Sequence, residues 1–165
     1  MKKILVFAVV FLLLTSCAGA SELANRFGMG INWLGGHMRY VIGDHWIAEG
    51  KVQVGFTNTL VGPRVYYLLD KIPGDTPLFP YAGIEYGYPI SQYLTGGYEA
   101  GLFLGVESLV NNNLGLGVDV GLCYVDIWSE LGGLGDMGLI FNVFVTYYFE
   151  DYPIKSSFKF SKSVL

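Results

Sequence analysis

The sequence predicts an all-β protein, an eight-stranded antiparallel up-and-down transmembrane β-barrel. Three observations indicate this fold class. Apolar and polar residues alternate through most of the chain, short turns separate the alternating segments, and 52% of the residues are hydrophobic although no apolar run of membrane-helix length follows the N-terminus. A period of two is the period of a β-strand, and about ten such residues can cross a bilayer when the strand is tilted.

The alternation is clearest in residues 113–127, which read NLGLGVDVGLCYVDI. Leucine, valine and tyrosine occupy the even positions, whereas glycine, Asp119 and Cys123 occupy odd positions. One face of this strand is therefore continuously apolar, and the other is small or charged. A strand of a soluble sandwich alternates in the same way, so the direction in which each face points decides between a soluble and a membrane protein.

The N-terminus has the parts of a bacterial secretory signal peptide. Lys2 and Lys3 precede an apolar run over residues 4–14, and the small residues 18–20 form a cleavage site. That run is too short to span a bilayer as a helix. We therefore assign residues 1–20 to a signal peptide and expect an exported protein.

The same segment offers an alternative cleavage site. Leu14-Thr15-Ser16-Cys17 also matches a lipobox, in which Cys17 becomes the lipidated first residue of a bacterial lipoprotein. Either cleavage fits the apolar run. In both cases Cys123 is left unpaired in the body of the chain, so the fold is not a disulfide framework. Loss of Lys2 and Lys3 changes the formal net charge from −4 to −6, which argues against a nucleic-acid partner.

Eight alternating segments follow in order, at about residues 26–34, 37–42, 46–57, 62–69, 78–88, 95–109, 113–127 and 138–149. Their connections carry turn residues: Gly35-Gly36, Gly43-Asp44, Thr57-Asn58-Thr59, Pro73-Gly74-Asp75 and Asn111-Asn112-Asn113. Short turns between successive strands predict an up-and-down barrel over residues 21–149. We expect the longest loop at residues 126–136, and both termini on the periplasmic side.

The polar faces of these strands hold charges of both signs. Sorting each strand by parity places eight ionisable residues on the polar faces: Arg39, Glu49, Lys51, Arg64, Glu85, Glu99, Glu107 and Asp119. In a soluble barrel these groups would lie in a dry core while the long apolar faces met water, and both arrangements are costly. In a membrane barrel the apolar faces meet lipid. The charges then form a structural ion-pair network in a lumen narrow enough to be filled by side chains.

Aromatic residues lie near many of the expected strand ends. They are Trp33, Trp46, Tyr66, Tyr67, Tyr88, Tyr93, Tyr124, Trp128, Tyr147 and Tyr148. Membrane barrels carry aromatic girdles at both interfaces. We therefore expect these side chains at the two rims.

Two stretches resemble small bacterial outer-membrane barrels of the OmpA and OmpX type. They are residues 80–87, PYAGIEYG, and residues 141–149, FNVFVTYYF, which form an alternating last strand with a terminal Phe149. The resemblance implies a Gram-negative outer-membrane location, with outer-membrane lipid and the barrel-assembly machinery as partners. The chain departs from this pattern because residues 150–165 follow Phe149. Those residues lack alternation and predict a flexible periplasmic C-terminal tail.

Residues with catalytic chemistry are sparse. The histidines are His37 and His45, which we expect at opposite rims, solvated or interfacial and without a serine partner. We therefore predict no enzyme activity, no catalytic residue, no cofactor and no metal. The expected role of this outer-membrane protein is structural or interactive, with a filled lumen and no identified ligand or protein partner.

Two other functions remain open. A soluble or lipid-anchored periplasmic β-barrel could bind an apolar ligand, but it would need the apolar faces inside. A lipid A-modifying outer-membrane enzyme would need a His–Ser pair near the outer rim.

Overall fold

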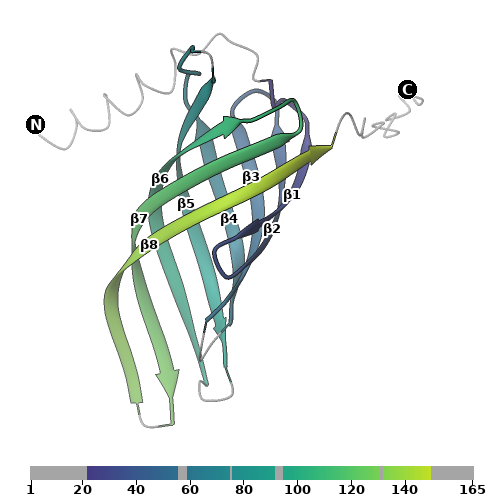
Figure 1. Cartoon of the computed structure of the whole chain (residues 1–165). Helices are drawn as coiled ribbons and strands as arrows, with labels where there is room; N and C mark the ends of the chain where they lie inside the picture. The colour runs from purple at the N-terminus through teal and green to yellow at the C-terminus, as the bar shows by residue number, and fades with distance from the viewer. Residues whose placement is uncertain (1–21, 56–58, 75, 92–94, 131, 150–165) are drawn as a thin grey trace, which may run out of the picture.

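The computed structural model describes residues 22–55, 59–74, 76–91, 95–130 and 132–149. They form a closed barrel of eight antiparallel strands, each paired with its neighbours in chain order (Figure 1). The predicted all-β, up-and-down fold class is thereby confirmed. Among these residues no helix is long and apolar enough to cross a membrane. The predicted signal peptide of residues 1–20, Cys17 and the predicted tail of residues 150–165 lie outside the described residues.

The strands lengthen along the chain, from six residues in the first to 18 in the last. They are β1 (Phe27–Asn32), β2 (Gly35–Ile42), β3 (Trp46–Val54), β4 (Thr59–Leu68), β5 (Leu78–Ile90), β6 (Gly96–Leu109), β7 (Leu114–Ser129) and β8 (Gly132–Phe149). Phe27 at the start of β1 pairs with Phe149 at the end of β8. We call the end of the barrel that holds this pair the terminal end, and the opposite end the distal end.

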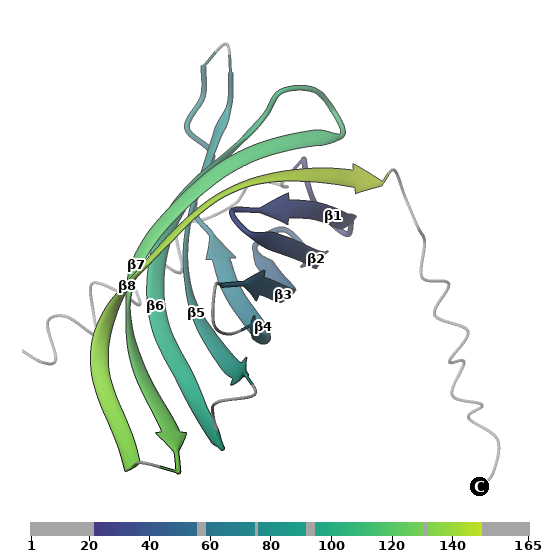
Figure 2. The ribbon, with the colours of Figure 1, turned by 60° about the horizontal axis from the view of Figure 1, so that its bottom comes forward.

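The barrel wall is uneven at the distal end. β1 pairs with β8 only as far as Asn32 and Phe144, followed by one hydrogen bond from Trp33 N to Val143 O of 2.9 Å. The first part of β8, residues 132–142, is therefore paired only with β7 among the described residues. Figure 2 shows β5–β8 as a curved sheet that reaches beyond the short strands β1–β4. One edge of β8 is consequently open at the distal end.

Two of the expected turns are wrong. Most of the expected loop over residues 126–136 is strand, because β7 and β8 stay paired as far as Ser129 and Gly132. The glycine-rich start of β8 is extended by this pairing, and the Trp128 ring packs over Gly133. The turn expected at Gly35-Gly36 lies just before these two residues and includes Leu34, which has a positive φ of 70°.

The predicted parity of the strands is confirmed. Asp119, Glu107 and Arg64 are buried inside the barrel, whereas Leu104 and Val120 are exposed on its outer wall. The outer wall is apolar all round, with more than half of the side chain exposed at residues such as Ile31, Met38, Ile84, Leu102 and Phe141. The alternation along each strand therefore separates a charged lumen from an apolar exterior.

The lumen is filled in layers. At the terminal end it holds apolar side chains from five strands and from the segment before β1, Leu23, Val41, Ile47, Leu68, Phe79 and Leu109. Glycines in the wall make room for the aromatic rings of the next layer. A Cβ atom on Gly105 would lie 2.3 Å from the Tyr81 ring, and one on Gly117 would lie 2.2 Å from the Phe144 ring. The core of this protein is thus the inside of the barrel.

Aromatic side chains form a row on the outer wall near each end. At the distal end Tyr98 contacts Tyr86, Tyr124 and Trp128, with ring centroids 6.1 to 6.5 Å apart. At the terminal end the contacts join Trp46 with Tyr67 and Phe149 with both Phe27 and Tyr147.

Two aromatic assignments are wrong. Tyr66 and Tyr148 have the parity of the charged residues and point into the lumen, where both are buried. Their hydroxyl groups donate hydrogen bonds there, so burial leaves them paired. Tyr93 lies outside the described residues.

Candidate functional site

The charged lumen is the most distinctive site of the molecule. Each strand contributes the residues of one parity, so side chains from seven strands converge on the barrel axis. Arg39 on β2 contacts two carboxylates: its Nη2 lies 2.9 Å from Glu49 Oε2, and its Nη1 lies 2.9 Å from Glu107 Oε2. All three side chains are almost fully buried. Arg39 therefore links β2 to β3 and β6.

Arg64 on β4 contacts three carboxylates. Its Nη1 lies 3.2 Å from Glu49 Oε1, its Nε 2.9 Å from Glu85 Oε2, and its Nη2 2.9 Å from Asp119 Oδ2. Glu49 and Glu85 are its direct cross-strand neighbours, whereas Asp119 lies across the lumen on β7. A planar guanidinium group with several donors suits such a shared position.

Tyrosines and an asparagine complete the network. The hydroxyls of Tyr66 and Tyr148 donate to Glu49 Oε2 at 2.9 Å and to Glu107 Oε1 at 2.8 Å. Tyr81 donates to Asp119 Oδ2 at 3.3 Å, and Asn142 Nδ2 donates to Asp119 Oδ1 at 2.8 Å. These donors satisfy carboxylate oxygens that would otherwise be buried without a partner.

Aromatic rings cover the guanidinium groups. The Cζ atom of Arg64 lies 3.8 Å from the ring centre of Phe103, and that of Arg39 lies 4.5 Å from the ring centre of Phe144. Such contacts favour a cation in a site with little water. Phe103 and Phe144 therefore both fill the lumen and stabilise its charges.

Seven of the eight charged residues assigned to the lumen from the sequence take part in these ion pairs. The remaining ion pair among these residues joins Lys51 Nζ to Glu85 Oε2 at 3.1 Å. Glu99 is half-buried on β6 and lies outside the salt bridges of the described residues. Glu85 is its diagonal neighbour on the lumen side of the wall, since Gly87 pairs with Glu99 and Glu85 pairs with Gly101.

The sequence analysis missed five polar or aromatic members of the site, Tyr66, Tyr81, Asn142, Thr146 and Tyr148. The sequence did indicate that they lie in the lumen, because all five share the parity of the charged residues on their strands. Asn142 pairs directly with Asp119 across β7 and β8. Sorting the last strand by parity would have placed three of them in the lumen.

The structure places His45 at a rim, as expected, but not His37. His37 is buried in the lumen, not solvated at a rim, because it has the same parity as Arg39. Its Nε2 lies 2.8 Å from the hydroxyl oxygen of Thr146. His45 lies in the turn before β3 and stacks on Tyr67, with ring centroids 5.1 Å apart. Cys123 is buried in the lumen wall, in agreement with its parity.

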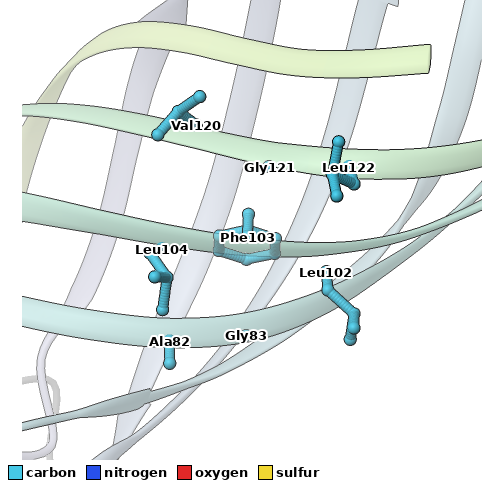
Figure 3. A pocket seen from close by; sticks show the side chains of 8 residues that line it. All are labelled: Ala82, Gly83, Leu102, Phe103, Leu104, Val120, Gly121 and Leu122. Carbon is cyan, nitrogen blue, oxygen red and sulfur yellow. The ribbon is translucent and has the colours of Figure 1, made fainter.

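An apolar furrow of about 460 Å³ runs along the outer wall (Figure 3). Leu102 and Leu104 on β6 form one side of it, and Val120 and Leu122 on β7 form the other. Its floor is the backbone between these side chains, because Phe103 and its cross-strand partner Gly121 have lumen parity. The furrow belongs to the apolar exterior and contains no charged residue among those that line it.

Within the part of the chain that the structure describes, no group of three or more His, Cys, Asp or Glu side chains could hold a metal ion. No protein-family model, curated protein or solved structure matches this chain. The arguments for function therefore rest on the barrel itself.

Proposed function

We propose that this chain is an integral outer-membrane β-barrel protein with a filled lumen and a structural or interaction role, and without catalytic activity. The observation that carries the proposal is the inverted distribution of residues. Charged side chains such as Arg39 and Glu107 are buried inside, while Leu102 and Val120 are 67% and 57% exposed outside. In water this exterior would be one continuous apolar surface, far larger than the patches that soluble monomers expose. Hydrocarbon is the solvent that suits it.

The height of the apolar wall supports the same proposal. On β8 the distal aromatic row is level with Met137, which pairs with Tyr124, and the terminal row includes Tyr147. About ten residues of a tilted strand separate Met137 from Tyr147, which corresponds to an apolar band of about 25 Å between the aromatic girdles. These dimensions support the proposal of an outer-membrane barrel.

The contents of the lumen argue against both alternatives. A soluble barrel for an apolar ligand needs an apolar cavity, whereas this lumen is occupied by ion pairs and aromatic rings. A lipid A-modifying enzyme needs an accessible nucleophile and base near the distal rim. His37 and Thr146 are instead buried in the lumen, and His45 lies at the terminal end. We therefore favour the non-catalytic membrane barrel over these two functions.

The proposal is tested by expressing the full chain in a Gram-negative host and fractionating the membranes. We expect the protein in the outer-membrane fraction after an alkaline wash, migrating faster on a gel before boiling than after it. Recovery in the soluble periplasmic fraction would contradict membrane insertion. In planar bilayers the purified protein should show no large, steady conductance because its lumen is filled. Sustained conductance would contradict the filled lumen while leaving insertion intact.

A further inference from the structure

The distal half of the lumen contains a pair of carboxyl groups that face each other. Glu85 on β5 and Glu99 on β6 are diagonal neighbours on adjacent strands, since Glu85 pairs with Gly101 and Gly87 pairs with Glu99. Diagonal neighbours on one face of a sheet lie within reach of each other when their side chains are long. Two ionised carboxylates placed in this way repel each other unless a positive species lies between them.

The two oxygens of Glu85 differ in their surroundings. Oε2 accepts from Lys51 Nζ at 3.1 Å and lies 2.9 Å from Arg64 Nε. Oε1 is buried and has no hydrogen-bond donor among the described residues. The side chain of Glu85 is only 3% exposed, so bulk water does not solvate that oxygen freely. A bound cation, directly or through its water ligands, would satisfy such an oxygen.

The charges of the lumen do not balance. Among the described side chains, three cations, Arg39, Lys51 and Arg64, face five carboxylates, Glu49, Glu85, Glu99, Glu107 and Asp119. Glu49, Glu85, Glu107 and Asp119 each contact a guanidinium group within 3.2 Å. Of the five carboxylates, Glu99 alone lies outside the salt bridges of the described residues, so part of the negative excess lies at Glu99 beside Glu85, where a cation would reduce it.

The approach to this pair is acidic. Glu99 is half-buried, and beyond it at the distal end lie Asp136, which has the lumen parity of β8, and Glu130. The described part of the distal end beyond Lys51 contains no lysine or arginine, whereas apolar side chains fill the terminal end of the lumen. A cation would therefore be attracted to, and would enter from, the distal opening.

We propose that Glu85 and Glu99 bind one hydrated divalent cation of the oxygen-preferring class, Ca²⁺ or Mg²⁺, in the distal half of the lumen. Two carboxylates are sufficient for such an ion when water supplies its other ligands. The site is consistent with the lack of a larger metal-binding cluster in the described residues. It requires a lumen that is open at the distal end and does not depend on membrane insertion.

The test uses the purified full chain, folded in detergent at neutral pH with about 150 mM KCl to suppress weak surface binding. After treatment with a chelator, CaCl₂ and MgCl₂ are titrated separately by calorimetry, and thermal unfolding is followed with and without each ion. We expect one ion per chain and a higher unfolding temperature that the chelator reverses.

Glu99→Gln is the informative variant, because Glu99 lies outside the ion pairs with Arg64 and Lys51 and its replacement should leave the barrel folded. We expect it to weaken cation binding at least about tenfold, which corresponds to about 1.4 kcal/mol. The matched control is Asp126→Asn, which removes a distal carboxylate that accepts a hydrogen bond from the Trp128 indole at 3.1 Å. The control should bind the ion as the unchanged protein does.

Two results would overturn the proposal. If the unchanged protein binds neither ion, the carboxyl pair is bridged by a shared proton and not by a metal. If Glu99→Gln binds as tightly as Asp126→Asn, the ion lies elsewhere on the acidic distal end. Both results leave the outer-membrane proposal untouched, since fractionation and gel migration test it separately.

Discussion

Arg64 Nη2 on β4 lies 2.9 Å from Asp119 Oδ2 on β7, so this ion pair crosses the lumen between strands that are not neighbours. The pair can form only after the sheet has closed, because β4 and β7 are separated by β5 and β6. It therefore links the first and second halves of the barrel in a way that strand pairing alone does not.

Breaking this network should be costly. Arg64→Met leaves Glu49, Glu85 and Asp119 without their shared cation, and we expect it to lower the free energy of unfolding by about 3–5 kcal/mol. Arg64→Lys should have an intermediate effect because an ammonium group cannot reach all three carboxylates. The measurement is urea unfolding of the protein folded in detergent. The control is Lys71→Met, which removes an exposed ion pair with Glu22 and should cost under about 1 kcal/mol. Equal effects of the two methionine variants would contradict a buried network.

The outer wall should reject a charge. Val120 is 57% exposed at mid-wall, and Val120→Arg would place a guanidinium group against lipid at a cost of about 2–4 kcal/mol near the bilayer midplane. We expect a large loss of the fast-migrating, folded band in outer membranes. Val120→Leu, which keeps the position apolar, should insert normally. Equal folded yields from the arginine and leucine variants would show that Val120 does not face lipid.

Two glycines provide a matched test of lumen packing. A Cβ atom on Gly105 would collide with the Tyr81 ring, which is buried and held by Tyr66 with ring centroids 4.9 Å apart. Gly105→Ala should therefore destabilise the barrel by about 1–3 kcal/mol. Gly50 faces outward with no atom within 4 Å of such a Cβ, so Gly50→Ala should be neutral or slightly stabilising. Urea unfolding of both variants measures the difference, and a stable Gly105→Ala would mean that Tyr81 is free to move.

The open edge of β8 should tolerate proline. Val143 O accepts from Trp33 N, whereas Tyr148 N donates to Asn113 O beside β7, so odd residues of β8 direct their main-chain groups toward β1 and even residues toward β7. At Leu139 no described strand lies on the β1 side. Leu139→Pro should therefore fold, because the lost N–H faces the open edge.

The control for this prediction is the preceding residue. Gly138→Pro removes an N–H that faces β7 and should abolish folding, while Gly138→Ala separates this effect from crowding against the Cys123 sulfur. The proportion of protein that migrates as the folded band is the readout for all three variants. Failure of Leu139→Pro together with success of Gly138→Ala would mean that the edge is paired.

The sequence determined the fold class and the side of the wall on which each charged residue lies. Alternation is a local property: once residues 113–127 form a strand, Asp119 and Val120 must point in opposite directions. An apolar exterior with charges of both signs inside then predicts a barrel with a paired interior. The same rule places Tyr66 and Tyr148 in the lumen. Their position near strand ends had instead led us to expect them at the rims.

Only the tertiary structure decided which residues meet. The partner of Arg64 on β7 depends on how the strands are staggered when the sheet closes, and no local pattern records that stagger. The start of β8 at Gly132 could not be predicted from the sequence for a related reason. The glycines there adopt an extended conformation only because β7 supplies their hydrogen-bond partners. The register of β5 and β6 places Glu99 beside Glu85, and of these two only Glu85 pairs with cations, Lys51 and Arg64, among the described residues. Parity assigns a residue to the lumen, but three-dimensional proximity determines its partner.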